Sequence, residues 1–122
     1  IIDLMEGQKN IKNKGGTMRL GSYNCSLEKG TIAYKTYKNN EINERHRHRY
    51  EFNNLYKKEF NDSGMITSGI NKKLDLVEVI ELKNHPWFIG TQYHPEYRSR
   101  VLKPHPLFIS FVKKIKSIKN GQ

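Results

Sequence analysis

Two apolar segments joined by a short polar turn constrain the fold of this chain more than any other feature of its sequence. In residues 74–82 apolar side chains alternate with polar ones, which predicts a β-strand. After a turn at residues 83–86, residues 87–93 are almost continuously apolar, which is typical of a strand covered on both faces. The sequence therefore predicts a sheet with a buried strand that ends near residue 93.

Weaker patterns indicate the elements around this sheet. Apolar residues recur at steps of three and four through residues 107–118 and predict an amphipathic helix that ends among lysines. We expect strands at residues 17–27 and 65–69, and a strand followed by a short helix at residues 31–38. Residues 1–16 form a single predicted loop, whose glycine pair allows a mobile backbone.

The chain has 122 residues, the size of one small domain or of part of a larger one. It opens on apolar residues at Ile1, as a cut inside a strand would, so we expect a fragment. Its only cysteine is Cys25, which excludes an internal disulfide and fits a reducing, cytoplasmic location. No apolar stretch approaches the ~20 residues that cross a membrane. We therefore predict no membrane association.

A formal net charge of +10 raises the alternative of a basic module that binds RNA or an acidic partner. The lysines are scattered along the sequence, however, and scattered lysines are typical of a solvated surface. Binding to single strands also needs aromatic residues interleaved with basic ones on an exposed face. Most aromatic residues here fall at positions that we expect to be buried. We predict that nucleic acid is not the partner.

The segment around His94-Pro95-Glu96 carries the most specific chemistry. It follows the predicted buried strand, at the kind of position where sheets present functional side chains. Pro95 favours an extended backbone at His94, and residues i and i+2 of an extended chain point to the same side. We expect Glu96 to hold one imidazole nitrogen of His94 and to leave the other as a base. A histidine and a glutamate held by ordinary loop hydrogen bonds are the alternative.

Residues 92–97, Gln-Tyr-His-Pro-Glu-Tyr, resemble the signature of class I (triad-type) glutamine amidotransferases. The blocks at residues 15–21, 44–53 and 84–88 extend the resemblance to the amidotransferase domain of the CTP synthase family. The Arg-His-Arg-His-Arg-Tyr-Glu run that begins at Arg45 is its specific part. The fold that this implies is a three-layer α/β, flavodoxin-like domain with a mixed sheet, of which residues 1–122 would be the C-terminal portion. Residues 1–16 would include a lid loop associated with GTP activation.

The resemblance implies catalytic roles for His94 and Glu96 in hydrolysing L-glutamine, with Arg49 binding the glutamine. The ammonia would serve ATP-dependent amination of UTP to CTP on a separate synthetase domain, within an enzyme that uses Mg²⁺, is activated by GTP and forms a homotetramer. This fragment itself would hold no cofactor. An extended run would place Arg45, Arg47 and Arg49 on one face and the two histidines between them on the other.

The chain departs from the family at the nucleophile. Family members carry it in a Gly-x-Cys-x-Gly elbow, which this sequence lacks. We expect Cys25 to be a buried strand residue, so the chain alone is predicted to be inactive. A degenerate amidotransferase kept as a regulatory scaffold is a further alternative. A zinc site at His46 and His48 would need more ligands, and the single cysteine lies about twenty residues away, so we predict no metal.

Overall fold

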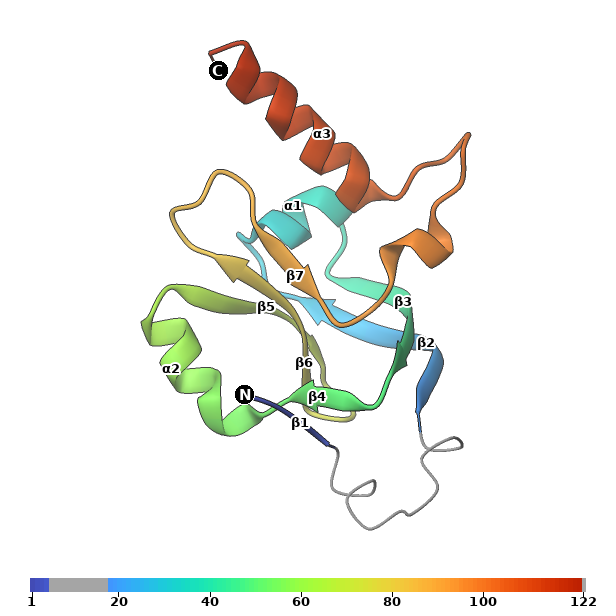
Figure 1. Cartoon of the computed structure of the whole chain (residues 1–122), viewed down its shortest axis with the longest axis vertical. Helices are drawn as coiled ribbons and strands as arrows, with labels where there is room; N and C mark the ends of the chain where they lie inside the picture. The colour runs from blue at the N-terminus through green and yellow to red at the C-terminus, as the bar shows by residue number, and fades with distance from the viewer. Residues whose placement is uncertain (5–17, 122) are drawn as a thin grey trace.

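The structure of the chain, a computed structural model, describes residues 1–4 and 18–121. Strands dominate the chain until a long C-terminal helix (Figure 1). In chain order the elements are β1 (Ile2–Leu4), β2 (Arg19–Leu27), α1 (Ile32–Tyr37), β3 (Glu41–His48), β4 (Tyr50–Phe52), the 3₁₀ helix η3 (Asn54–Tyr56), α2 (Lys57–Asp62), β5 (Met65–Asn71), β6 (Leu76–Leu82), β7 (Ile89–Thr91), the 3₁₀ helix η4 (Pro95–Arg98) and α3 (Pro106–Lys119). The prediction of a single loop over residues 1–16 is wrong at Ile2–Leu4, which pair with β4 as strand β1. The rest of the predicted lid, residues 5–16, lies outside the described residues.

Five strands form one curled sheet in the order β3-β2-β5-β6-β7, and β1 pairs with β4 in a separate two-stranded sheet (Figure 1). All pairings between the described strands are antiparallel, rather than the mixture that the resemblance implied. For β5–β6 and β6–β7 the short connections, residues 72–75 and 83–88, explain this, because a parallel pair needs a crossover of about a dozen residues or more. The chain is α/β, as predicted. The three-layer, flavodoxin-like arrangement stays a prediction for the larger domain.

The strand predicted at residues 87–93 is shorter and less covered than expected. Only Ile89–Thr91 pair with β6, and their side chains are half-buried. Trp87 precedes the strand, and its indole N–H donates to Ser110 Oγ of α3 at 2.8 Å. The prediction of a strand covered on both faces is wrong for this chain, because all three residues of β7 stay partly exposed. Among the described residues β7 is also the edge of the sheet.

Residues 31–38 form a helix without the strand that the sequence predicted before it. Thr31 is the N-cap of α1, and its hydroxyl accepts from the backbone N–H of Tyr34. The Glu81 carboxylate of β6 accepts from Ile32 N and Ala33 N, at 2.7 and 2.9 Å. These oxygens satisfy N–H groups that have no partner within the helix. A residue 49 positions away therefore helps to start α1.

A small core lies between the sheet, α1 and the start of α3. Cys25 is fully buried in β2, as predicted. Gly69 of β5 lies against it, and a Cβ at this glycine would lie 2.6 Å from Val79 Cγ2 and 2.9 Å from Cys25 Sγ. Only a residue without a side chain lets β5 approach β2 and β6 this closely. The core consists of Cys25, Leu27, Ala33, Ile42, Val79, Tyr93 and Leu107.

The predicted amphipathic helix is confirmed as α3, but its apolar face is largely uncovered. Leu107 at its start is buried, whereas five later apolar residues are between 41% and 54% exposed. These residues, which we call the α3 stripe, are Phe108, Phe111, Val112, Ile115 and Ile118. An apolar stripe of this kind marks a surface that packs against something else. None of the described helices is long and apolar enough to cross a membrane.

Candidate active site

His94 and Glu96 form a hydrogen-bonded pair directly after β7. His94 Nδ1 lies 2.6 Å from Glu96 Oε1, and the hydrogen bond from His94 is the main cause of the lowered pKa of Glu96. The His94 backbone is extended, with φ −107° and ψ 94°, but Glu96 lies in the first turn of η4. The side chains therefore meet through a turn that Pro95 starts, and not through the continuous extended chain that the sequence predicted. Because Glu96 occupies Nδ1, Nε2 is the nitrogen left to accept a proton.

The aromatic ring of Tyr97 stacks on the imidazole of His94. The ring centroids are 4.7 Å apart and the planes differ by 11°. The backbone of the same loop is tied to β3, because His94 N donates to Arg45 O at 2.9 Å. The Arg98 guanidinium donates to the carbonyl of Asn43 in the same strand. These contacts fix the backbone and the ring of His94 independently, and the sequence pattern did not reveal them.

A cavity of about 580 Å³ lies between β2, β3 and Tyr97. A second cavity of about 400 Å³ adjoins it and shares Arg45 and Tyr97. Volumes of this order suit small-molecule sites. Neither His94 nor Glu96 lines either cavity, and Tyr97, which lines both and stacks on His94, connects the pair to this hollow. The lining of the larger cavity comprises Met18, Leu20, Gly21, Arg45, His46, Arg47 and Tyr97.

The arginine–histidine run follows the predicted alternation only as far as its strand extends. In β3, Arg45 and Arg47 are exposed while His46 is buried. The strand ends at His48, and Arg49 lies half-buried at the bend that leads into β4. Arg49 is therefore not part of the strand face that carries the other two arginines, contrary to the prediction for a fully extended run. Neither of the two cavities is lined by Arg49.

A buried ionic cluster, which the sequence analysis missed, lies on the other side of β3. The Arg19 guanidinium contacts Glu51 Oε1 at 2.9 Å and Glu78 Oε1 at 2.7 Å, and all three side chains are at most 4% exposed. Burial raises the pKa of Glu51 to about 7. His46 Nδ1 lies 2.7 Å from His48 Nε2 and 3.7 Å from Glu78 Oε2. Burial also lowers the pKa of His46 to about 3 and that of His48 to about 4, so both rings are neutral near pH 7.

This cluster contains the donor set that a metal would use, since ligand atoms of His46, His48 and Glu78 lie within 4.8 Å of one another. His48 Nδ1 contacts the carbonyl of Tyr50 at 3.0 Å and must donate to it, so its Nε2 accepts from His46 Nδ1. The ring nitrogens that face each other are thus joined by a hydrogen bond. Arg19 supplies the positive charge beside the carboxylates. We infer a structural ion-pair network here and assign no metal to it.

Cys25 lacks the properties of a nucleophile in this structure. It is fully buried, and burial raises the pKa of its thiol to about 12. The thiolate, not the thiol, attacks a carbonyl, and reactive cysteines have lowered pKa values. The described residues therefore hold a histidine–carboxylate pair without a reactive sulfur beside it.

Comparison with known proteins defines the class to which this arrangement belongs. Residues 4–114 match the family described as glutamine amidotransferase class-I, and the chain belongs to this family. A solved structure described as the Trypanosoma brucei CTPS glutaminase domain with bound acivicin superposes with a TM-score of 0.84 at 32% identity. The superposition covers 93% of this chain and 45% of that one.

Within the family, the resemblance to CTP synthases that the sequence indicated is confirmed. The chain is 59% identical over 113 residues to the CTP synthase of Christiangramia forsetii, which covers 93% of the chain. It is 56% identical over all 122 residues to that of Methanosphaera stadtmanae. These matches span only 21% and 23% of the two relatives, so the chain corresponds to about a fifth of their length.

Proposed function

We propose that this chain is the base-bearing part of a glutaminase that hydrolyses L-glutamine within a CTP synthase. The observation that carries the proposal is the His94–Glu96 pair at 2.6 Å in a chain of the amidotransferase family, with the cavity-lining Tyr97 stacked on His94. The ammonia would be used for ATP-dependent amination of UTP to CTP elsewhere in the enzyme. Mg²⁺, GTP activation and a homotetramer belong to the same proposal, and no residue of this chain is assigned to them.

His94 would act as the base and then as the acid of the reaction. Its Nδ1–H donates to Glu96, so Nε2 takes the proton of a cysteine thiol. The thiolate adds to the amide carbon of glutamine, and the tetrahedral intermediate collapses as the imidazolium returns its proton to the departing ammonia. Water, deprotonated by the same nitrogen, then hydrolyses the thioester to glutamate. Arg49 would bind the α-carboxylate of glutamine, because a guanidinium can donate two parallel hydrogen bonds to it.

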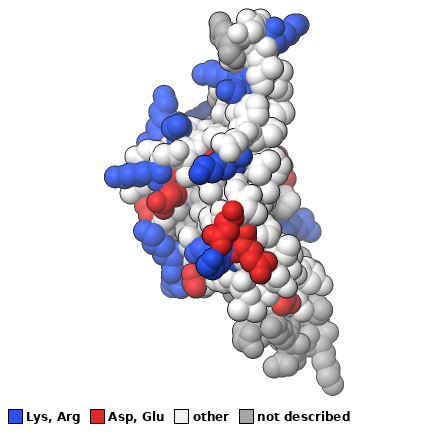
Figure 2. Space-filling view, turned by 90° about the vertical axis from the view of Figure 1, so that its left-hand side faces the viewer, with Lys and Arg blue, Asp and Glu red and all other residues white. Residues whose placement is uncertain are grey.

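The cysteine would come from polypeptide outside this chain. Two surfaces support this proposal, because each lacks a covering layer among the described residues. One is the α3 stripe, and the other is the outer edge of β7 with its half-buried residues. The chain covers 45% of a solved glutaminase domain, so the rest of such a domain is large enough to cover both. A non-catalytic basic module is a weaker candidate, because Figure 2 shows Lys and Arg scattered among other residues over the face it displays.

Two assays test the proposal. The 122-residue chain and its Cys25→Ala variant should both release no ammonia from glutamine, and Cys25-dependent release would contradict it. In the complete enzyme, His94→Ala should lower glutamine-dependent CTP formation by at least about 10²-fold, the usual effect of a lost general base. CTP formation from added ammonia should continue. Equal loss with both nitrogen sources would refute a catalytic role. His85→Ala, which changes an exposed histidine in the preceding turn, is the matched control.

A further inference from the structure

A second buried cluster lies beneath the His94 loop, and neither the family resemblance nor the proposed mechanism assigns it a role. Its centre is the carboxylate of Glu44 in β3, which is 3% exposed. Glu44 Oε1 accepts from the Tyr37 hydroxyl at 2.9 Å and contacts His105 Nε2 at 2.6 Å. The hydroxyls of Tyr37 and Tyr93 are 3.1 Å apart. Side chains from α1 and from the N-cap of α3 therefore meet at one carboxylate oxygen of β3, and Tyr93 in the loop after β7 is linked to it through Tyr37.

The hydrogen-bond partners determine where each proton lies. His105 Nδ1 accepts from Leu107 N at 3.1 Å and so caps α3, which leaves the proton of a neutral ring on Nε2, facing Glu44. Tyr37 has one proton and donates it to Glu44. The Tyr93 hydroxyl must therefore donate to Tyr37. The chain of donors runs in one direction, from Tyr93 through Tyr37 to Glu44. His105 Nε2 also lies 3.3 Å from the Tyr37 hydroxyl, a longer contact than the 2.6 Å to Glu44.

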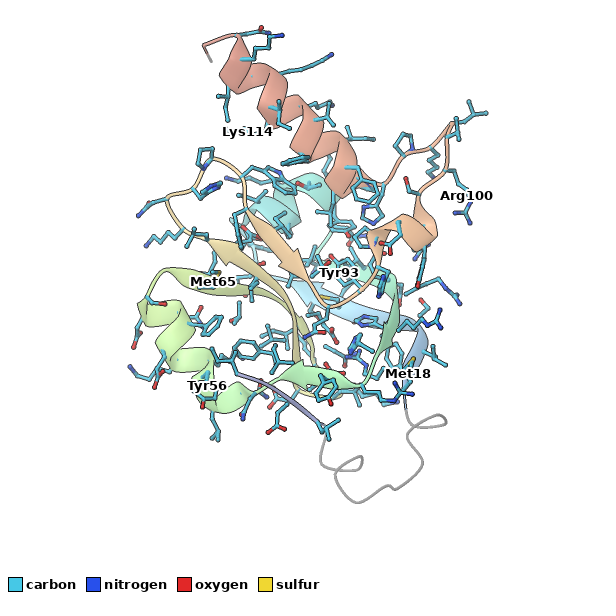
Figure 3. The ribbon with its side chains drawn as sticks, viewed as in Figure 1. Met18, Tyr56, Met65, Tyr93, Arg100 and Lys114 are labelled. Carbon is cyan, nitrogen blue, oxygen red and sulfur yellow. The ribbon has the colours of Figure 1, made fainter. Side chains whose placement is uncertain are left out.

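This chain of hydrogen bonds begins at Tyr93, one peptide bond before His94. Tyr93 is 3% exposed and lies in the interior between β7 and β3 (Figure 3). The residue after Glu44 in β3 is Arg45, whose carbonyl accepts from His94 N at 2.9 Å. The backbone of His94 is thus held from two adjacent β3 residues, by a direct bond from Arg45 and through side chains from Glu44. Glu96 and Tyr97 act on its ring instead.

We propose that Glu44 is a positioning residue for His94, acting through Tyr37 and Tyr93. The inference rests on the proposed function, because it concerns the placement of the catalytic base. Glu44 contacts neither substrate nor His94 itself. A displacement of about 1 Å at a reacting group can cost about 10²-fold in rate, so removing a buried anchor one peptide away should reach the chemistry.

The test uses the complete enzyme with glutamine or ammonia as the nitrogen source. Glu44→Ala should lower the glutamine-dependent kcat by about 10²-fold and Tyr93→Phe by about tenfold, with KM for glutamine nearly unchanged. The ammonia-dependent rate, which reports on the separate synthetase domain, should stay at the wild-type level. The unchanged KM for glutamine shows that the amidotransferase domain of each variant folds. Glu44→Gln keeps an oxygen that accepts both hydrogen bonds and should restore most of the glutamine-dependent rate. Glu41→Ala, at an exposed glutamate of the same strand, is the matched control.

The outcomes separate this inference from the proposed function. If His94→Ala abolishes glutamine-dependent activity while Glu44→Ala and Tyr93→Phe leave its kcat unchanged, the positioning role is refuted and the proposed function stands. If His94→Ala has no effect, both are refuted. A purely structural role would disturb the glutamine site as a whole and raise KM for glutamine together with the loss of kcat, and that result also refutes positioning. Should Glu44→Ala fail to fold, Tyr93→Phe decides the question, because it removes one hydroxyl and keeps the ring.

Discussion

The buried ion pairs of Arg19 allow a prediction with a calculable size. Arg19→Met removes the guanidinium and keeps a side chain of similar length. The carboxylates of Glu51 and Glu78, 4% and 0% exposed, are then left without their cation. Removing one partner of a buried ion pair costs about 3–5 kcal/mol, against a total of about 5–15 kcal/mol for an ordinary domain. The free energy of unfolding should therefore fall by a large part of its total.

The loss should depend on pH in a defined direction. Burial already raises the pKa of Glu51 to about 7, and burial also raises the pKa of Glu78. Arg19 opposes both shifts, so its removal raises both pKa values further. The folded variant then holds protons that the unfolded chain releases above the ordinary carboxyl pKa of 4.5. The protons bound to these two carboxyl groups stabilise the folded variant, and this stabilisation is complete below pH 4.5. As pH rises above that value, the free energy of unfolding falls by up to about 2.7 kcal/mol per pH unit for the two groups.

Urea unfolding at pH 6 and pH 8 tests this reasoning, with far-UV circular dichroism and the fluorescence of Trp87, the only tryptophan, as probes. The penalty of Arg19→Met should be larger at pH 8. Arg47→Met, at an exposed arginine of β3, should change the free energy by less than about 0.5 kcal/mol. Adding Glu51→Gln and Glu78→Gln to Arg19→Met should recover much of the loss. A penalty below about 1 kcal/mol that is equal at both pH values would refute a buried ion-pair network.

Three further predictions follow from the packing. Gly69→Ala places a Cβ within 2.9 Å of Val79 and Cys25 atoms and should destabilise the chain by about 1–3 kcal/mol in urea unfolding, whereas an unchanged midpoint would show that the strands can separate. Glu81→Ala removes the carboxylate that accepts from two N–H groups of α1. The free energy of unfolding should fall by about 1–2 kcal/mol, and amide-exchange protection at the start of that helix should weaken. Protection equal to wild type would contradict the capping role of Glu81. Cys25, with its pKa raised to about 12 by burial, should resist iodoacetamide at pH 8 until urea unfolds the chain, and rapid labelling of the folded chain would be the opposite result.

The contact between His94 and Glu96 was predictable, although its backbone route was not. A short sequence separation limits the geometries available, and Pro95 excludes a helical conformation at His94. Either an extended chain or a tight turn then brings the side chains together, so the contact could be predicted without knowing which one forms. The stacking of Tyr97 on His94 depends on the 3₁₀ turn of η4, and alternation alone would not have indicated it.

The extent of β7 shows where sequence reasoning failed. An apolar run shows that residues avoid water, but not whether another strand or a helix covers them. Trp87 is shielded from water by α3, although it lies outside the strand. Its ring contacts Phe111, and its indole N–H donates to Ser110. Trp87 therefore packs on the neighbouring helix outside the strand, and the residues of β7 itself stay only half-buried among the described residues.

By itself the sequence determined the local features of this protein: the alternating strands, the amphipathic C-terminal helix, the buried Cys25 and the motif that identifies its family. These depend on periods of two or about four residues and on the restricted backbone of proline. Only the tertiary structure decided which charges share the interior. Arg19 meets carboxylates 32 and 59 positions away, and Glu44 meets a histidine 61 positions away. Burial makes such pairings strong, but it is the folding of distant strands against one another that selects the partners, and no local pattern encodes that choice.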